Sequence, residues 1–370
     1  MPPQDSHLEQ LRKAGELSRN GDMAAARDLL RPLLAQGENP EVQRLASFHA
    51  IQLFFIGDFR EAVAALEPYV QAGSKDADAL AHYAFARFAL QDMAESIRAS
   101  REALMLRPQD VGTLKTLGMA SMVNAQLLDA FMAFSAAQLV QPNGGFDVFR
   151  TLAMRLMQGQ SVVEFNFDGE RYRFNLRVDN GQMLEAATHH ARGVLTEQEE
   201  LRLIREKVGS SRVMIEVGTL VGNHLVYFLK TLKPRKAIVF DISPSSIDAS
   251  AANARLNEPY STTPELDFRT RGIGIASDTI VGPDGNPAQI TSIDEAVADE
   301  VDFMKIDVDG LEIEALNGAR RLIERARPRI MIEIAREHDP AFQVLLDELR
   351  YVVIGHIDRG LHRNYLIASR

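Results

Sequence analysis

The chain has 370 residues, 46% of them hydrophobic and 25% charged, a composition that suits a globular protein of two or three domains. The net charge of −10 argues against nucleic acid or an anionic membrane surface as the main partner, because both need a basic face. The absence of cysteine excludes disulfides, thiolate zinc sites and a cysteine nucleophile.

The N-terminal stretch MPPQDSHLEQ lacks the basic start and apolar core of a signal peptide. The most apolar long stretch, residues 119–140, is interrupted by Asn124, Gln126 and Asp129, so we expect no membrane span. We therefore expect a cytoplasmic protein.

Residues 1–145 contain an internal repeat. The segments NGDMAAA, IGDFREA, LQDMAES and NAQLLDA align, and their small residues Ala26, Ala62, Ser96 and Ala130 lie 36, 34 and 34 positions apart. This spacing predicts pairs of amphipathic helices that cross closely at the small residue. The alternative is that the alanines serve only as good helix formers.

The period and the turn before the small residue resemble tetratricopeptide repeats. Pro108 and Pro142 close the second helix of their repeats, whereas Pro32 and Pro68 fall inside it and should kink or shorten it. We expect a right-handed α-solenoid with a capping helix at residues 146–157. Such arrays usually bind a peptide or protein, so we expect a protein partner on the repeats.

Residues 146–210 are predicted to connect two domains through the capping helix, a β-hairpin and a further helix. Asp168-Gly169 separates two alternating runs, which is a strong hairpin signal. The pattern favours a hairpin packed at the domain junction, and the alternative is one wall of an acceptor pocket. The helix over residues 196–208 should have Thr196 as its N-cap and Glu199 in a capping box.

In residues 211–370, strands alternate with helices, as in a doubly wound α/β domain. The last two strands should form an antiparallel hairpin, because only a short turn separates them. A seven-stranded, mostly parallel sheet that ends in such a hairpin is the strand plan of Rossmann-like methyltransferases. The predicted strands are 213–217, 237–241, 267–275, 302–307, 330–334, 352–356 and 364–367.

The first strand of this domain leads into a glycine turn. Gly218 and Gly222 allow a ligand to approach the backbone, and the amides at the start of the next helix suit a polar group. Asp241 closes the second strand, where an acid accepts hydrogen bonds from a ribose diol. This combination predicts a binding site for a nucleoside-type cofactor. The turn lacks the G-x-G-x-x-G fingerprint of dinucleotide-binding proteins.

Five segments resemble, in order, the motifs of the FkbM-family methyltransferases: IEVGTLVGNH, VFDISPSSIDASAANARLN, ITSIDEAV, VDFMKIDVDGLEIEALNGAR and RIMIEI. In the first motif Glu216, Gly218 and Gly222 match, while Thr219 and Leu220 replace the family's Ala-Asn. The second keeps its acid but loses a proline, and the fourth has Asp309 where the family prefers Glu. The resemblance covers residues 216–334 and implies an S-adenosylmethionine-dependent enzyme with a Rossmann-like fold.

The resemblance also implies roles for individual residues. Glu216 should face the methionine amino group or a loop amide, and Asp241 should face the ribose hydroxyls. Asp278 should read the adenine amine, or else act as a turn or N-cap residue. The predicted cofactor-binding residues are Glu216, Gly218, Thr219, Gly222, Asn223, His224, Asp241, Ile242, Ala276, Ser277 and Asp278.

The acceptor half of the site should lie at the later strand ends, since ligands bind at the carboxyl edge of open α/β sheets. The candidate catalytic residues are Asp307, His338 and Lys305, although Lys305 can instead serve to neutralise buried acids. One interpretation has a carboxylate or histidine as the base. The other has Asp307 and Glu333 holding a divalent cation that acidifies a sugar hydroxyl.

The sequence therefore predicts an S-adenosylmethionine-dependent O-methyltransferase acting on a hydroxyl of a glycan or sugar-containing small molecule. The repeats would recruit a partner or help enclose the acceptor. One alternative is a non-catalytic interaction protein with a degenerate methyltransferase fold, which the replacements at Thr219 and Leu220 favour. A second is a protein side-chain methyltransferase whose repeats hold the substrate.

Overall fold

The computed structural model describes residues 59–71, 73–281, 287–308 and 310–370, with short helical pieces between residues 9 and 29. Within it the chain divides into two compact units. The first comprises residues 1–159 and 178–184, and the second residues 160–177 and 185–370. Most of the first predicted repeat, including Ala26 and Pro32, and the acid Asp309 lie outside the described residues. The predicted boundaries at residues 145 and 210 stay predictions.

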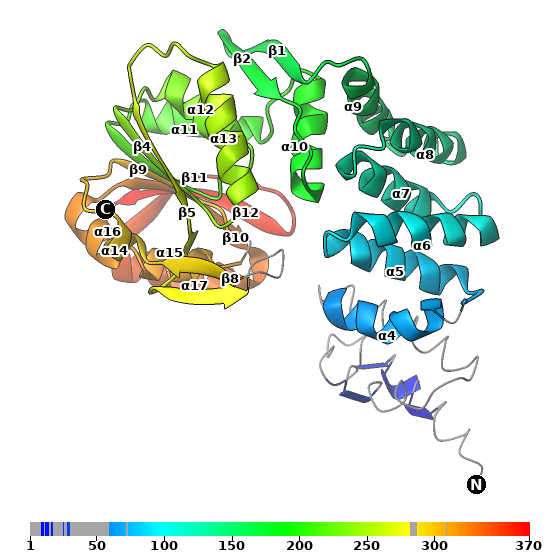
Figure 1. Cartoon of the computed structure of the whole chain (residues 1–370). Coiled ribbons are helices and arrows are strands. Elements are labelled where there is room, and N and C mark those ends of the chain that lie inside the picture. Colours follow the sequence, from blue (N-terminus) through cyan, green and yellow to red (C-terminus); the bar gives the residue numbers. More distant parts are fainter. Residues whose placement is uncertain are drawn as a thin grey trace. The chain divides into compact units, whose positions relative to one another are not determined.

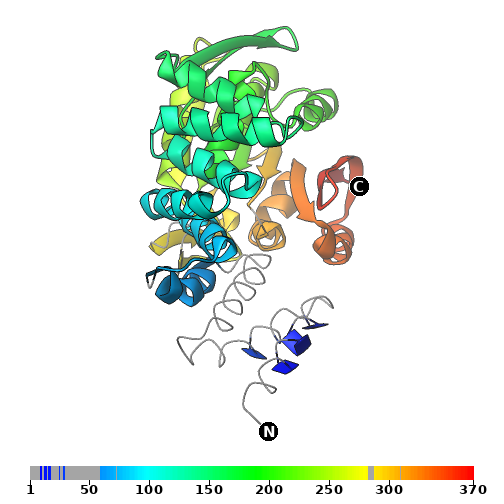
Figure 2. The same cartoon turned by 90° about the vertical axis from the view of Figure 1, so that its right-hand side faces the viewer.

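The first unit is a stack of helices that follow one another in chain order (Figure 2). α7 begins 34 residues after α5, and α8 begins 34 residues after α6, which is the predicted period. The carboxylates of Asp76, Asp92 and Asp110 accept hydrogen bonds from the first-turn amides of α5, α6 and α7. The helices are α4 (Phe59–Gln71), α5 (Ala77–Ala89), α6 (Met93–Leu106), α7 (Val111–Val123), α8 (Leu127–Val140) and α9 (Asp147–Met157).

The small residues of the repeat lie where helices meet. Ser96 and Ala130 are completely buried, and a Cβ atom added to Gly118 would stand 2.7 Å from the ring of Phe134. Larger side chains would force these helices apart, as the repeat predicts. The expected shortening at Pro68 does not occur, because α4 continues to Gln71.

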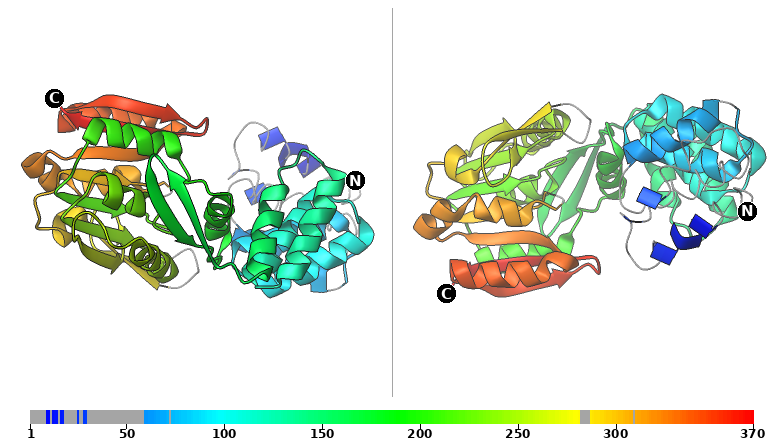
Figure 3. Two further views of the ribbon diagram at one scale, coloured as in Figure 1. Left: turned by 90° about the horizontal axis from the view of Figure 1, so that it is seen from above. Right: turned by 90° about the horizontal axis from the view of Figure 1, so that it is seen from below.

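The second unit is built on a seven-stranded sheet with the order β11-β12-β10-β9-β3-β4-β5. β12 pairs antiparallel with β10 and β11, and the other pairs are parallel. The predicted fold class is thus confirmed, and Figure 3 shows the β11–β12 hairpin in red at one edge. The strands are β3 (Val213–Val217), β4 (Lys236–Asp241), β5 (Glu265–Thr270), β9 (Phe303–Ile306), β10 (Arg329–Ala335), β11 (Tyr351–Asp358) and β12 (His362–Ser369).

The predicted strand over residues 267–275 is wrong in its second half. β5 ends at Thr270, and β6 (Gly272–Ile273) joins a separate sheet with β8 (Pro287–Thr291) and β7 (Asp278–Val281). A Cβ atom on Gly272 would lie 2.7 Å from Ile290 and 3.2 Å from Ile242, so this glycine permits the close crossing where the chain leaves the main sheet.

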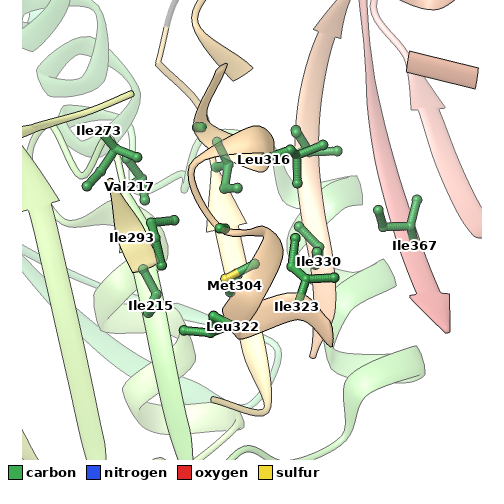
Figure 4. Close-up of a cluster of buried hydrophobic side chains, with 14 of the residues drawn as sticks. Ile215, Val217, Ile273, Ile293, Met304, Leu316, Leu322, Ile323, Ile330 and Ile367 are labelled. Carbon is green, nitrogen blue, oxygen red and sulfur yellow. The ribbon is translucent and has the colours of Figure 1, made fainter. Parts of the chain in front are cut away.

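Helices cover both faces of the main sheet (Figure 1). One face carries α11 (Gln198–Val208), α12 (Asn223–Thr231) and α13 (Pro244–Leu256). The other carries α14 (Ile293–Ala296), α15 (Glu312–Asn317), α16 (Arg320–Ala326) and α17 (Asp339–Leu349). On this second face, buried side chains of β3, β9, β10 and β12 meet those of α15 and α16, as Figure 4 shows for Ile215, Val217, Met304, Ile330, Ile367, Leu316, Leu322 and Ile323.

Successive side chains of β3 point to opposite faces of the sheet, and this alternation determines which of them lie outside this core. Ile215 and Val217 point into it, so Glu216 points to the opposite face, where its register neighbour on β9 is Lys305. The polar residues of the candidate site are thereby kept together on the side of α11 and α12.

The Asp-Gly hairpin forms as predicted. β1 (Val162–Phe167) and β2 (Glu170–Asn175) pair around Asp168 and Gly169, both with positive φ. Together with part of α10 (Gly181–Ala191), the hairpin belongs to the second unit, where β2 packs on α13. None of the described helices is long and apolar enough to cross a membrane.

The predicted capping box at Thr196 and Glu199 is wrong. α11 begins at Gln198, and Glu197 precedes it in a left-handed conformation with φ of 52° and no side-chain cap. Tertiary contacts explain the difference, because the Thr196 amide donates to Asn223 and the Glu197 carboxylate lies 3.1 Å from His224 Nε2.

Candidate active site

The loop between β3 and α12, residues 218–222, is fixed by two glycines. Gly218 and Gly222 have φ of 78° and 74°. A Cβ atom at Gly218 would lie 1.8 Å from the Asp307 carbonyl oxygen, and one at Gly222 would lie 2.7 Å from Ser250 Oγ. Neither position has room for a side chain, so the loop is held against β9 on one side and α13 on the other.

Asp241, at the end of β4, organises this loop. Its Oδ2 accepts from the amides of Thr219 and Leu220, both at 3.1 Å, and its Oδ1 accepts from Ser243 at 2.9 Å. Burial raises the pKa of Asp241 above its ordinary value, although the three amides oppose that rise. A carboxylate offers about four acceptor positions, so one remains for a ligand hydroxyl.

Glu216 is a buried acid without a hydrogen-bond partner among the described residues. Its side chain is 0% exposed, and neither carboxylate oxygen has a hydrogen bond from any described group. Burial raises its pKa to about 7. Because an unsatisfied buried carboxylate is costly, the position fits a ligand that brings a cationic donor, such as an α-amino group.

Lys305 links the loop to the end of β9. Its Nζ lies 2.8 Å from Asp307 Oδ2 and donates to the Gly218 carbonyl oxygen at 3.0 Å. Burial lowers the pKa of Lys305, but the charges of Asp307 and Glu216 outweigh that effect and hold it above its ordinary value. Lys305 is therefore a charged, buried group that neutralises acids around it.

A contact between a histidine and an acid borders the loop beside the start of α11. His224 is almost buried at the start of α12, and its Nε2 lies 3.1 Å from Oε2 of Glu197. Burial raises the pKa of Glu197, but His224 and then Lys305 overcome that effect and bring it to about 2. Glu197 was not among the predicted site residues, because its place depends on the unexpected backbone turn before α11.

At the next strand end, Glu333 of β10 pairs with a histidine that sequence reasoning missed. Its Oε2 lies 3.0 Å from His362 Nε2, the first residue of β12. Burial raises the pKa of Glu333 to about 8, and the nearby charges of Asp307 and Glu197 add to the rise. The structure therefore gathers Glu197, Lys305, Asp307 and Glu333 into one electrostatically coupled cluster.

His338 is not part of this cluster in the described contacts. It lies in the short helix η1 (Arg336–His338) after β10, with its side chain 40% exposed and its imidazole 3.8 Å from Glu337. The physical reason is that the chain turns away from the sheet edge after Ala335, while β12 returns to it at His362.

The residues predicted to hold a divalent cation do not fit one. Asp307 is bonded to the Lys305 ammonium, and Glu333 is paired with His362. Among the residues that the structure describes, no group of three metal-ligating side chains comes together. The buried Lys305 ammonium already neutralises the Asp307 carboxylate and would repel a divalent cation beside it.

The remaining predicted cofactor residues fall into two groups. Thr219 Oγ1 bonds Ser250 Oγ at 2.8 Å, and the Asn223 amide bonds Thr196, so both side chains brace the loop from within. The other group lies after β6, where Ala276, Ser277 and Asp278 are exposed, Ser277 donates to Glu295, and Asp278 accepts from the amide of Thr279. Ile242 is half-buried beside Gly272. Contacts of all these residues with a cofactor stay predictions.

Comparison with known sequences bears on this arrangement. The sequence model described as the methyltransferase FkbM domain matches residues 145–365, which is more than half of the chain. The chain belongs to the FkbM methyltransferase family. No curated protein sequence matches it.

Solved structures similar to this FkbM-family chain match either part of it. Methyltransferase FkbM from Methylobacillus flagellatus KT is 18% identical, with 60% of each chain covered and a TM-score of 0.38. A tetratricopeptide repeat protein from Parabacteroides merdae ATCC 43184 is 16% identical, covering 42% of this chain and 62% of its own, with a TM-score of 0.38. MamA from Desulfovibrio magneticus RS-1 is 15% identical, covering 42% of this chain and 87% of its own, with a TM-score of 0.38. The chain thus spans about three fifths of the length of the first two structures.

Proposed function

We propose that this FkbM-family methyltransferase transfers a methyl group from S-adenosylmethionine to a hydroxyl of a glycan or sugar-containing small molecule. The observation that carries the proposal is Glu216, a fully buried carboxylate two residues before the glycine loop, whose oxygens accept no hydrogen bond from any described group. It would hold the amino group of the donor, while the free acceptor position of Asp241 would take a ribose hydroxyl. When bound, the donor supplies an electrophilic methyl group on a positively charged sulfur.

The acceptor side needs a group that takes a proton from the attacking hydroxyl. His362 is partly exposed, and its imidazole is held by Glu333 at 3.0 Å. The Glu333 carboxyl orients the imidazole, and because its pKa is about 8, its charge stabilises the imidazolium that forms when the proton arrives only above about that pH. We therefore assign His362 as the general base and Glu333 as its positioning partner, in place of His338.

The charges around this pair support a polyol as acceptor. The side chains of Glu197 and Asp307 are 35% and 27% exposed, and both belong to the cluster with Glu333. Carboxylate oxygens accept hydrogen bonds and donate none when ionised, so they complement the hydroxyl donors of a sugar. The repeats are proposed to recruit a protein partner.

Two measurements test the proposal. Isothermal titration of the full chain with S-adenosylhomocysteine should show binding, and its absence would favour a degenerate, non-catalytic fold. Incubation with methyl-labelled S-adenosylmethionine and cell lysate, followed by separation into glycan and protein fractions, should place the label in glycans. Label in the protein fraction alone would favour a protein side-chain methyltransferase.

A further inference from the structure

Two asparagines of α13 bind the open edge of hairpin strand β2. Asn253 Oδ1 accepts from the Asn175 amide at 2.8 Å. One helical turn later, Asn257 accepts from the Arg173 amide at 3.0 Å and donates to the Arg173 carbonyl oxygen at 2.7 Å. Residues 173 and 175 are two apart on the strand, so their backbone groups face the same edge. The two side chains thus make hydrogen bonds of the kind that the backbone of a neighbouring strand would make.

Asn253 also contacts the glycine loop. Its Nδ2 donates to the Val221 carbonyl oxygen at 2.8 Å, so both polar groups of this buried amide are bonded, one to the hairpin and one to the loop. Ser250, one turn earlier on α13, packs against Gly222 and bonds Thr219. One face of α13 therefore connects the hairpin to the loop.

A second connection runs through α10. The imidazole of His190 stacks on Phe174 of β2 with ring centroids 3.9 Å apart, and its Nε2 lies 3.1 Å from Asn223 Oδ1. Complete burial lowers the pKa of His190 to about 4, so the ring is neutral at physiological pH. Because Asn223 is the first residue of α12, this contact reaches the end of the same loop.

We propose that Asn253, anchored to the β1–β2 hairpin through the Asn175 amide, is the positioning residue that holds the donor loop through the Val221 carbonyl. This inference rests on the proposed function in taking residues 218–222 as the donor-binding loop. The Val221 carbonyl follows directly after the two amides that Asp241 holds, so a change at Asn253 is transmitted to the groups that face the donor.

The test compares Asn253→Leu with Asn257→Leu in the full chain. Leucine has the shape of asparagine without its hydrogen-bonding atoms, and both positions are buried on the same helix. Hydrogen exchange of the amides in residues 218–225 and the affinity for S-adenosylhomocysteine are measured for each variant. N253L should accelerate exchange in the loop and weaken binding about tenfold, the loss expected for one hydrogen bond. N257L should accelerate exchange in β2 only and leave affinity within about twofold.

The matched variant makes the result decisive. N257L removes at least as many hydrogen bonds, so equal losses of affinity in both variants would mean general destabilisation and overturn the proposal. Unchanged loop exchange in N253L would overturn it as well. If N253L does not fold, Asn253→Ser takes its place in the same comparison. A wild-type chain that fails to bind S-adenosylhomocysteine would refute the proposed function, while the exchange data would still decide whether Asn253 couples hairpin and loop.

Discussion

The carbonyl oxygen of Asp307 lies 1.8 Å from the position that a Cβ atom of residue 218 would occupy. Gly218→Ala must therefore push β9 away from the loop, and it also places alanine at a φ of 78°. We expect a loss of about 2–4 kcal/mol in the free energy of unfolding, measured by urea denaturation. Gly209→Ala is the control, because its φ is 73° with nothing within 4 Å of the added atom. An equal loss in both variants would show that backbone strain, not the contact with Asp307, sets the requirement for glycine.

The buried pair of Lys305 and Asp307 offers a second prediction. Lys305→Met leaves Asp307 and its acidic neighbours without their counter-charge, so the free energy of unfolding should fall by about 3–5 kcal/mol. Asp307→Asn added to this variant should restore part of the loss, since one of the uncompensated charges is then gone. Denaturant unfolding of the two single variants and the double variant measures the coupling. Additive losses would contradict it.

The ionised Glu216 carboxylate is expected to lower the stability of the folded protein and to contribute to binding of the methyl donor. Its folded pKa of about 7 lies above the ordinary value of 4.5, so the folded state binds more protons than the unfolded state between these values. The stability that this carboxyl contributes is present below about pH 4.5 and is lost as the pH rises through 7.

Glu216→Gln should remove that dependence. Relative to wild type, the variant should gain stability as the pH rises, reaching about 1–3 kcal/mol at pH 8. The same change removes the carboxylate proposed to hold the donor amino group, so affinity for S-adenosylhomocysteine should fall. Urea denaturation at pH 5 and pH 8, together with calorimetric titration, measures both effects. A constant stability difference across this range would contradict the assigned ionisation.

Sequence periodicity was enough to predict the elements whose residues interact locally or alternate regularly between polar and apolar. The run of residues 213–217, the Asp168-Gly169 turn and the 34-residue repeat each specify an element by their own pattern, and the structure contains all three. The Thr196 cap failed because Asn223, from a distant segment, takes the Thr196 amide. Capping rules consider only residues near the start of the helix in sequence, so they do not include such a partner.

The neighbouring positions of Glu216 and Asp241 were predictable from the sequence, whereas the contact between His362 and Glu333 was not. Glu216 and Asp241 lie at strand ends next to the glycine loop, so chain position alone placed them together. His362 reaches Glu333 through the antiparallel register of β10 and β12, in which Ala335 faces His362. A one-residue slip of that register would turn the imidazole to the other face of the sheet. No short motif in the sequence indicates this register.

Substitution can distinguish the roles of His338 and His362. If His362 is the base, His362→Gln should lower kcat about 10²–10⁴-fold and leave the affinity for S-adenosylhomocysteine unchanged. His338→Gln should retain full turnover, because its side chain is 40% exposed and its described contact is with Glu337 at 3.8 Å. Glu333→Gln should give an intermediate loss that grows above about pH 8, because there the imidazole keeps a hydrogen-bonding neighbour but loses the charge that stabilises its protonated form. Transfer of label to the acceptor fraction measures turnover, and a loss confined to His338→Gln would assign the base to that residue instead.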